Sequence, residues 1–474
     1  MGPAAPASLV RGRPAHGLFL AAIAVEGYAV LAVELLAIRQ LTPFVGNATD
    51  VVAIVIAAVL MPLALGYEAG GRAGIAAGDG DAVRRRLGAN LLAATAILGL
   101  GLSTPVLHAL FAGLDRAGLG HRLAGTALHA ALFLAAPVYL LGQTVPLVTR
   151  CLGQGDLARL TGRVLFVSTL GSFLGSIVST LVLMTWLGVH ATVMATLGLV
   201  LALAARVAWP RHPRQALLAA LLAAAVVGLY DPALVRWSHG IVADGPYSQV
   251  RIVEPGDGSR LMVVNNSPSS KLAPRPEERF AYVRFIEDEV IARLDPGRAH
   301  RILVVGAGGF TIGLRDAVNL YTYLDLDPAL QAVAEAHFLG APLGPNKTFV
   351  AEHARAHLRR APAGAYDLVV LDAYTNRLDI PADLVTREWF AAVCRTLAPG
   401  GQVVMNVVAS PRFTDRFSRS IDATIRSVFP WVTRQVIRVP GRDDVASILY
   451  LAADQPDTGH DVYTDDRNRS GLDR

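Results

Sequence analysis

Apolar positions are distributed unevenly along this chain. From residue 17 to about residue 230, one long apolar run follows another, and the runs contain few charges. A helix needs about 20 apolar residues to span a bilayer, and Ala216–Tyr230 falls short of that length. The other runs approach or exceed it: Gly17–Ile38, Val51–Ala69, Leu87–Ala109, Leu123–Val148, Val164–Leu187 and His190–Ala208. The pattern predicts an N-terminal tail over residues 1–16 and an α-helical transmembrane bundle of six or seven helices over residues 17–230.

Polar residues inside the apolar runs add two hypotheses. Glu26 and Glu34 lie on the first run, eight positions apart and within one broad helical face. Ionisable residues within a membrane mark functional sites by default. The competing interpretation is that Glu34 pairs with Arg39 near the end of the run. Gly171 and Gly175 form a small-xxx-small pattern, which predicts close packing against another helix.

The pattern changes after about Arg236. Short strand-like runs now alternate with helical patterns, which predicts an α/β fold with a parallel sheet. Tyr247–Glu254 alternates in polarity, a turn follows, and Arg260–Val264 runs back, which predicts a hairpin. We expect a small β region over residues 236–270 and a Rossmann-like domain over residues 271–474. The strands expected in that domain are residues 301–305, 319–324, 348–350, 366–371, 402–408 and 447–452.

A glycine-rich loop follows the first of these strands. Gly306 and Gly308 allow a tight turn and a close backbone approach to a ligand, and the following segment is expected to be a helix that faces the ligand with its N-terminus. Asp325 ends the next strand, 19 residues after Gly306, close to the spacing of a ribose-binding acid. Asp327 competes for that role, although it precedes a proline and would also serve as a helix cap. We expect at least one of the two to contact a ribose.

Further polar residues follow the next strands. His353 comes directly after residues 348–350, and it is a candidate for contacting a nucleobase or else a surface residue. Asp372 stands at the end of residues 366–371, followed by Tyr374 and Asn376. Ligands of open α/β sheets bind outside the carboxyl ends of the strands. These side chains are therefore expected to face a cleft.

Composition excludes several classes of protein. Of the 474 residues, 53% are hydrophobic and only 17% are charged, and the mean hydropathy is +0.42. A single soluble domain and a disordered chain are both excluded. The two cysteines exclude a disulfide framework and a cysteine-based zinc site, and no cluster with metal-ligand spacing implies another metal. Despite the net charge of +5, no Lys/Arg cluster interleaved with aromatics indicates nucleic-acid binding.

The motifs of the C-terminal half resemble those of the spermidine synthase family, the polyamine aminopropyltransferases. The resemblance covers about residues 236–455, and it is closest to the bacterial branch fused to a multi-span membrane domain. Its fold is of the S-adenosylmethionine methyltransferase type. The similar segments are GPYSQ (245–249), residues 261–270, ERFAY (278–282), ILVVG (302–306), YLDLDP (323–328), YDLVVLDAY (366–374), LVTREWF (384–390) and LAPGG (397–401).

The resemblance implies a chemistry and a site. In the family, an amine attacks the aminopropyl carbon of decarboxylated S-adenosylmethionine, a sulfonium. The resemblance places Asp372 and Asn376 at the catalytic positions. The nucleoside positions are Gln249, Gly306, Gly308, Asp325, Asp327, His353 and Asp372. The amine positions are Tyr282, Tyr374 and Asn266.

The sequence also departs from the family pattern. The position of a second catalytic aspartate is occupied by Thr375-Asn376-Arg377, and Val283-Arg284 stands where the family has His-Glu. Fewer carboxylates and an added arginine disfavour a dicationic substrate, because like charges repel at low dielectric. The nucleoside half of the site is therefore better preserved than the amine half.

Three functions remain open. The first is aminopropyl transfer from decarboxylated S-adenosylmethionine to a small amine. The second is an S-adenosylmethionine-dependent methyltransferase that acts on a membrane-delivered acceptor. The third is a non-enzymatic membrane sensor or transporter for polyamines or nucleosides, in which Glu26 and Glu34 handle cations. A homodimer stays open as well.

The expected location is the cell membrane. Arginines concentrate before the first apolar run and in alternate connections, which places those connections in the cytoplasm. If Ala216–Tyr230 spans the bilayer, the α/β domain lies on the other side; if it does not, the domain is cytoplasmic. We expect a cytoplasmic domain because its nucleoside co-substrate is supplied there.

Overall fold

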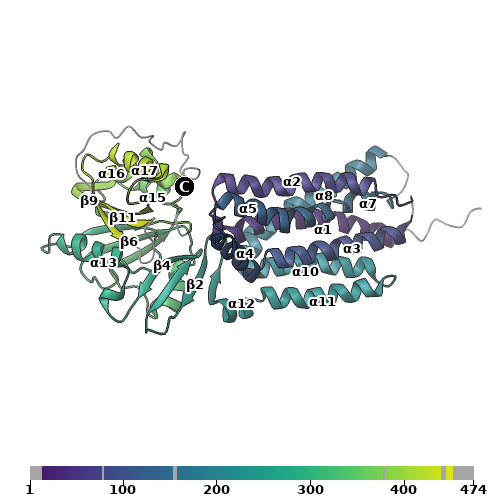
Figure 1. Cartoon of the computed structure of the whole chain (residues 1–474), viewed down its shortest axis with the longest axis horizontal. Coiled ribbons are helices and arrows are strands. Elements are labelled where there is room, and N and C mark those ends of the chain that lie inside the picture. Colours follow the sequence, from purple (N-terminus) through teal and green to yellow (C-terminus); the bar gives the residue numbers. More distant parts are fainter. Residues whose placement is uncertain (1–12, 77–78, 153–156, 377–378, 439–444, 452–474) are drawn as a thin grey trace, which may run out of the picture. The chain divides into compact units, whose positions relative to one another are not determined.

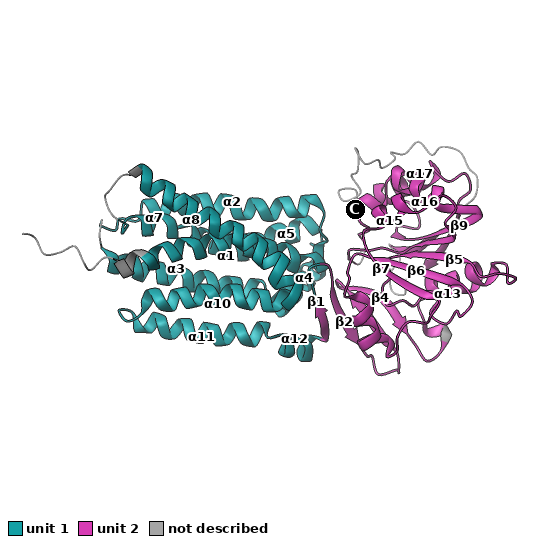
Figure 2. Ribbon diagram, turned by 180° about the vertical axis from the view of Figure 1, so that it is seen from behind, with its two compact units in different colours: residues 1–239, 244–246 teal, residues 240–243, 247–474 magenta. Residues whose placement is uncertain are grey.

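The computed structural model describes residues 13–76, 79–152, 157–376, 379–438 and 445–451. The chain divides into two compact units (Figure 2). The helical unit comprises residues 1–239 and 244–246, and the α/β unit comprises residues 240–243 and 247–474. Each unit is described by itself.

The helical unit consists of long apolar helices (Figure 1). Among the described residues, six helical segments are long and apolar enough to cross a membrane, and a bent pair of helices would make a seventh. This agrees with the number predicted from the apolar runs. The helices are α1 (Arg13–Val45), α2 (Thr49–Gly71), α3 (Gly80–Gly101), α4 (Thr104–Arg116), α5 (Arg122–Ala130), α6 (Ala136–Gly142), α7 (Thr144–Thr149), α8 (Leu157–Ile177), α9 (Thr185–Leu187), α10 (Val189–Ala208), α11 (Pro213–Tyr230) and α12 (Pro232–His239). Short π-helical turns join α5 to α6 and α8 to α9.

The third predicted segment, Leu87–Ala109, was wrong as one continuous helix. Helix α3 ends at Gly101, and α4 leaves it at an angle of 61°. Ser103 takes an extended conformation, its hydroxyl donates to Leu100 O over 2.7 Å, and Pro105 stands in the first turn of α4. Proline is well tolerated there and poorly tolerated inside a helix, so the break falls just before it.

Gly171 and Gly175 were predicted to pack closely against another helix, and this is confirmed, with α1 as the partner. A Cβ added at Gly171 would lie 2.2 Å from Ala24 O, and one added at Gly175 would lie 2.3 Å from Tyr28 O. From the other side, a Cβ at Gly27 would lie 2.3 Å from Ser168 O. The two backbones touch because both helices lack side chains at these positions.

The α/β unit begins with a small sheet. Its strands are β1 (Ile241–Asp244), β2 (Gln249–Val253), β3 (Arg260–Val264) and β4 (Ser267–Leu272), in that order. The antiparallel pair β2–β3 confirms the predicted hairpin. Strand β4 was not predicted. It pairs antiparallel with β3 through the two-residue turn Asn265-Asn266, in which both residues have positive φ, 46° and 60°. Asparagine tolerates that conformation better than most residues.

A seven-stranded sheet forms the rest of the unit, in the order β10-β11-β9-β8-β5-β6-β7. The run from β9 to β7 is parallel, and β11 is antiparallel to both β9 and β10. This is a Rossmann-like α/β sheet, as predicted. The strands are β5 (Arg301–Val305), β6 (Leu320–Asp325), β7 (Lys347–Ala351), β8 (Tyr366–Leu371), β9 (Leu397–Ala409), β10 (Thr433–Arg438) and β11 (Ala446–Leu451), and the helices are α13 (Ala281–Phe285), α14 (Leu330–Ala334), α15 (Ala354–Arg360), α16 (Arg387–Thr396) and α17 (Arg416–Arg426).

The predicted strands all form, with ends that shift by one or two residues except in β9. Residues 397–401 extend β9 beyond the predicted strand, and β9 pairs with β8 through a register shift near Tyr366. The irregularity is located at Gly400, whose φ is +75°. Strand β10 was not predicted; its side chains are largely exposed and lack an apolar face.

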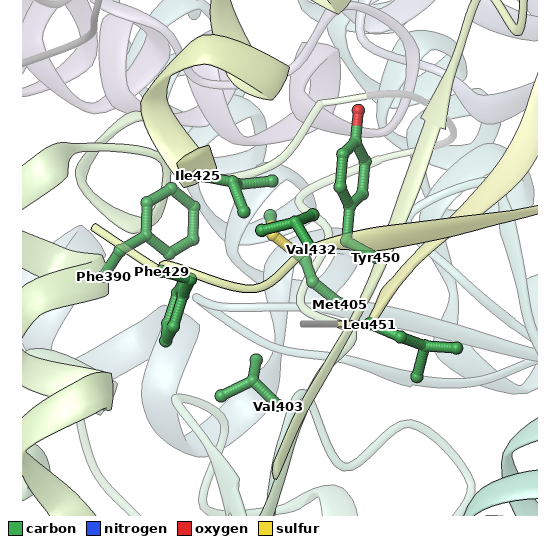
Figure 3. A pocket seen from close by; sticks show the side chains of 8 residues that line it. All are labelled: Phe390, Val403, Met405, Ile425, Phe429, Val432, Tyr450 and Leu451. Atoms are coloured by element: carbon green, nitrogen blue, oxygen red, sulfur yellow. The ribbon is translucent and has the colours of Figure 1, made fainter. Parts of the chain in front are cut away.

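Apolar side chains cover both faces of the large sheet. One cluster joins the sheet to α16 and α17 and includes Trp389, Phe390 and Ile421; another includes Phe310, Tyr321 and Phe338. Figure 3 shows a small hollow within the first cluster, and none of the predicted site residues lines it. Its lining residues are Phe390, Val403, Met405, Ile425, Phe429, Val432, Tyr450 and Leu451.

Candidate functional site

The carboxyl ends of three neighbouring strands define the site. Strand β5 lies between β6 and β8, and the chain order reverses there, because β6 and β7 extend to one side and β8 and β9 to the other. The ends are tied by backbone hydrogen bonds from Gly306 N to Leu324 O (2.9 Å) and from Asp372 N to Val305 O (2.8 Å). A reversal of this kind is where open α/β sheets bind ligands.

Glycines shape the loop that follows β5. Gly306 has a φ of +90°, and a Cβ there would lie 2.3 Å from Asp372 O. Gly308 has a φ of +51°, and a Cβ there would lie 2.7 Å from the Ser269 hydroxyl. Both positions therefore require glycine, for conformation and for space. The loop packs tightly on β4 and on the residue after β8.

The expected helix after this loop was wrong. Residues 306–319 contain turns only. Gly313 has a φ of +71° with the Tyr321 ring against its Cα, and Phe310 has a φ of +60°, so the chain cannot continue as a helix. Asp316 holds the turns through Val318 N (2.8 Å) and the Tyr321 hydroxyl (2.7 Å). A helix N-terminus is therefore not what faces a ligand here.

Side chains from two strands hold the loop instead. Ser270 of β4 accepts a hydrogen bond from Gly309 N over 2.8 Å. Asp325 of β6 accepts one from Ala307 N over 3.2 Å. Ser270 was not predicted, because serine carries no motif of its own and its place on a strand beside the loop is visible only in the fold.

The two acids after β6 differ in their surroundings. Asp327 is 6% exposed and accepts hydrogen bonds from the Ser248 hydroxyl and from Ala329 N (3.0 Å) in the turn before α14. Asp325 is more exposed, and burial raises its pKa to about 6 while hydrogen bonds from backbone N–H groups oppose the rise. Of the two, Asp325 is the acid better placed to meet a ligand.

Asp372 is held from both sides. Tyr282 of α13 donates its hydroxyl to Asp372 Oδ2 over 2.9 Å, and Asn406 Nδ2 of β9 donates to Oδ1 over 2.9 Å. Burial raises the pKa of Asp372 to about 6, although both hydrogen bonds lower it. Burial and the Asp372 charge raise the pKa of Tyr282, so its hydroxyl stays protonated. A carboxylate with a pKa near neutrality can serve as a general base.

The sequence analysis did not name Asn406. It is 4% exposed, and its Oδ1 has no hydrogen-bond partner among the described residues. An unpaired buried acceptor is costly unless a ligand satisfies it. A signal was present in the sequence: one amide interrupts the apolar strand VVMNVV (403–408), next to the strand that ends at Asp372.

Two other predicted residues are engaged elsewhere. The Tyr374 hydroxyl donates to Asn406 O (2.9 Å) and accepts from Val408 N (2.8 Å), which ties the loop after β8 to β9. The Asn376 amide donates to Asp379 Oδ2 (2.9 Å) and accepts from Asp379 N (3.0 Å). Both residues brace the loop that carries Asp372.

The small sheet and β7 supply the remaining predicted residues. Gln249 is 6% exposed on β2, and its backbone N–H donates to Asn265 Oδ1 over 3.0 Å. Asn266 Oδ1 is a buried acceptor without a partner among the described residues. His353 Nε2 lies 3.1 Å from Asp383 Oδ2, with both side chains about half exposed. Within the described ranges, no group of three His, Cys, Asp or Glu side chains could hold a metal ion.

Comparison with known proteins finds similar enzymes. A polyamine aminopropyltransferase from Mycobacterium tuberculosis is 28% identical over 388 residues, which cover 74% of this chain and 71% of the relative. A polyamine aminopropyltransferase 2 from Streptomyces coelicolor is 26% identical over 474 residues, covering 90% of this chain and 80% of the relative.

The second similarity extends into the helical unit, because it covers most of the chain. The crystal structure of a probable spermidine synthase from Corynebacterium glutamicum has 22% identity and a TM-score of 0.38, covering 44% of this chain and 78% of that chain. No protein-family model matches. The curated relatives are polyamine aminopropyltransferases, and this chain is a transferase similar to them.

Proposed function

We propose that this protein is a membrane-bound aminopropyltransferase that uses decarboxylated S-adenosylmethionine and an amine. The observation that carries the proposal is the Tyr282–Asp372–Asn406 hydrogen-bonded group beside the glycine loop. It combines a carboxylate of raised pKa with an unpaired acceptor, Asn406 Oδ1, at the reversal of the strand order.

The amine nitrogen attacks the aminopropyl carbon attached to the sulfonium. A C–N bond forms, the C–S bond breaks, and its electron pair returns to sulfur, which leaves methylthioadenosine. The proton lost by the attacking amine goes to Asp372, which Tyr282 and Asn406 hold in position. A carboxylate with a pKa of about 6 is mostly ionised at neutral pH and accepts that proton.

The nucleoside is assigned to the glycine-loop side of the site. Asp325 accepts hydrogen bonds from the ribose hydroxyls, Gly306 and Gly308 allow close approach, and His353 lies toward the base. Asp327 is assigned a place next to Asp325, and Gln249 is assigned to the part of the site formed by β2. Tyr282, Tyr374 and Asn266 are assigned to the amine side, and Asn376 positions the Asp372 loop; no metal takes part.

The helical unit is assigned to the cell membrane. Its six helical segments of sufficient length and apolarity support a multi-pass bundle in a lipid bilayer. Several large side chains on these helices are exposed, including Met61, Phe166 and Trp186 at 65%, 65% and 81%. Lipid would cover such surfaces at little cost.

The test uses the full chain purified in detergent. With decarboxylated S-adenosylmethionine and an amine such as putrescine, we expect release of methylthioadenosine, and we expect Asp372→Asn to lower the rate at least 100-fold. Release of S-adenosylhomocysteine from S-adenosylmethionine would instead indicate a methyltransferase. Nucleoside binding without either product would contradict catalysis.

A further inference from the structure

The helical unit contains an odd number of lengthwise runs, and its ends can be matched through side-chain contacts. Helix α3 serves as the reference. Three contacts join its first residues to other helices: Arg84 Nη1 to Val207 O (3.3 Å), Gln215 Nε2 to Arg85 O (2.9 Å) and Arg86 Nη2 to Gln143 Oε1 (3.1 Å). The start of α3 therefore lies with the end of α10, the start of α11 and the end of α6.

The other end of α3 gathers the opposite termini. Four contacts define it: Gln40 Nε2 to Leu102 O (3.2 Å), His129 Nε2 to Gly101 O (2.9 Å), Tyr230 OH to Gly99 O (2.8 Å) and Thr104 Oγ1 to His190 Nε2 (2.8 Å). Here lie the ends of α1, α3 and α11, the first part of the α5–α7 run, and the start of α10. Thus α1 and α11 run parallel to α3, whereas α5–α7 and α10 run antiparallel to it.

The two remaining runs follow from their neighbours. Gly171 and Gly175 of α8 pack on Ala24 and Tyr28 of α1 in the same order, so α8 is parallel to α1. The end of α2 lies beside the end of α7, because Arg150 donates to the Gly71 carbonyl. Four runs therefore point one way and three point the other, and the chain enters and leaves this unit at opposite ends.

Two independent contacts fix the exit end. Asp244, which the chain reaches after α12, accepts hydrogen bonds from the His190 backbone N (3.2 Å) and side chain at the start of α10. Arg39, near the end of α1, donates to Gly245 O over 2.7 Å. The last residues of the helical unit are thus held where α1 ends and α10 starts.

Arginine distinguishes the two ends. Between residues 39 and 236, the end at the start of α3 carries ten: Arg72, Arg84, Arg85, Arg86, Arg150, Arg159, Arg163, Arg206, Arg211 and Arg214. The exit end carries four: Arg39, Arg116, Arg122 and Arg236. Short connections rich in Lys and Arg stay in the cytoplasm.

We propose that the α/β unit lies on the non-cytoplasmic side of the membrane. This rests on the proposed membrane placement, and it replaces the cytoplasmic position expected from co-substrate supply. The acceptor amine is then drawn from outside the cytoplasm. A sulfonium nucleoside carries a fixed charge that lipid does not admit, so a transport step has to supply it.

Native cysteines provide the test. Cys394 is exposed on α16 of the α/β unit, and Cys151→Ser leaves it as the only cysteine. We expect a membrane-impermeant maleimide to label Cys394 in intact spheroplasts as fully as after lysis. The matched control combines Cys151→Ser, Cys394→Ser and Ala76→Cys, which places an exposed cysteine between α2 and α3, and it should be labelled only after lysis.

The outcomes separate the steps of the inference. Both cysteines on one side would overturn the odd number of crossings. Reversed accessibility would keep seven crossings and overturn the orientation. Protein in the soluble fraction would overturn the membrane placement on which the proposal rests. Methylthioadenosine release in detergent does not depend on which side of the membrane the α/β unit occupies. If Cys394 stays unlabelled even after lysis, fusions at the C-terminus replace it as the test. An inactive alkaline phosphatase fusion together with a fluorescent green fluorescent protein fusion would place the C-terminus in the cytoplasm and overturn the proposal.

Discussion

Asp372 depends on two neighbours for its protonation. The Tyr282 hydroxyl lowers the pKa of Asp372 against the effect of burial, which holds it at about 6. Tyr282→Phe removes that donor, so the pKa of Asp372 rises and the acid limb of the rate profile moves to higher pH. We expect kcat/KM at pH 6 to fall more than at pH 8, measured by methylthioadenosine release across pH 5–9.

Tyr366→Phe is the matched control for this tyrosine. Its hydroxyl lies 2.7 Å from His357 Nε2 at the start of β8, the end of that strand away from Asp372. The acid limb of Tyr366→Phe should coincide with that of the unsubstituted protein. An unmoved limb in Tyr282→Phe would show that Asp372 is not the group that titrates.

The pair Asp325 and Asp327 separates binding from folding. Asp325→Ala removes the proposed ribose acceptor and should weaken methylthioadenosine binding at least tenfold, measured by calorimetry. Asp327→Ala removes the acceptor of Ala329 N in the turn before α14 and the partner of Ser248, so it should lower the free energy of unfolding by about 1 kcal/mol. Unchanged affinity in Asp325→Ala would contradict the ribose assignment.

The place of a single residue in the site was predictable where that residue directly follows a strand. Asp325 and Asp372 follow apolar strands, and parallel strands bring such ends together. Asn406 lies within a strand, where alternation alone does not say which face meets the ligand. Asn376 was assigned by resemblance, but its amide forms hydrogen bonds with the nearby Asp379. The loop folds back to bring these two residues together, and the sequence does not show this.

At the scale of elements, the glycine loop requires glycine at Gly306. Gly306→Ala combines a positive φ with a collision against Asp372 O. It should abolish nucleoside binding and lower thermal stability markedly. Gly400→Ala has a similar φ of +75° and nothing within 4 Å of an added Cβ, so it should cost only about 1 kcal/mol. Equal effects in the two variants would contradict the collision.

The contact between α1 and α8 provides a second comparison of glycines. Gly171→Leu places a large side chain against Ala24 O, and the two helices have to separate. Gly162→Leu on the same helix has open space around its Cβ. We expect Gly171→Leu to lower the melting temperature in detergent, measured by intrinsic fluorescence, whereas Gly162→Leu leaves it within a few degrees.

Elements were predictable in proportion to the regularity of their pattern. Buried runs such as residues 301–305 and 366–371 became strands with those bounds, because a parallel strand covered on both faces is apolar throughout. The expected helix after Gly308 failed because Phe310 takes a positive φ, which its burial against Tyr323 and Phe349 stabilises. Such tertiary compensation leaves no local signal.

For the whole molecule, the raised pKa values of Asp325 and Asp372 link stability to pH. The folded state holds these protons up to about pH 6, whereas an unfolded aspartate releases them near pH 4. The folded state thus binds more protons between these values, and the free energy of unfolding falls as pH rises from about 4 to about 6. Each of the two carboxyl groups accounts for about 2 to 3 kcal/mol of this decrease in the free energy of unfolding.

The double variant Asp325→Asn, Asp372→Asn removes both titrations while keeping similar volume. Its stability should therefore change less between pH 4 and pH 6, and it should exceed that of the unsubstituted protein at pH 7, where both carboxylates are charged and desolvated. The measurement is the thermal unfolding midpoint of the full chain in detergent at each pH. A ligand that binds Asp325 and Asp372 as charged groups would raise the unfolding midpoint of the unsubstituted protein at pH 7 and leave that of the double variant unchanged. The two carboxylates that lower stability at pH 7 would then be the ones that bind the ligand.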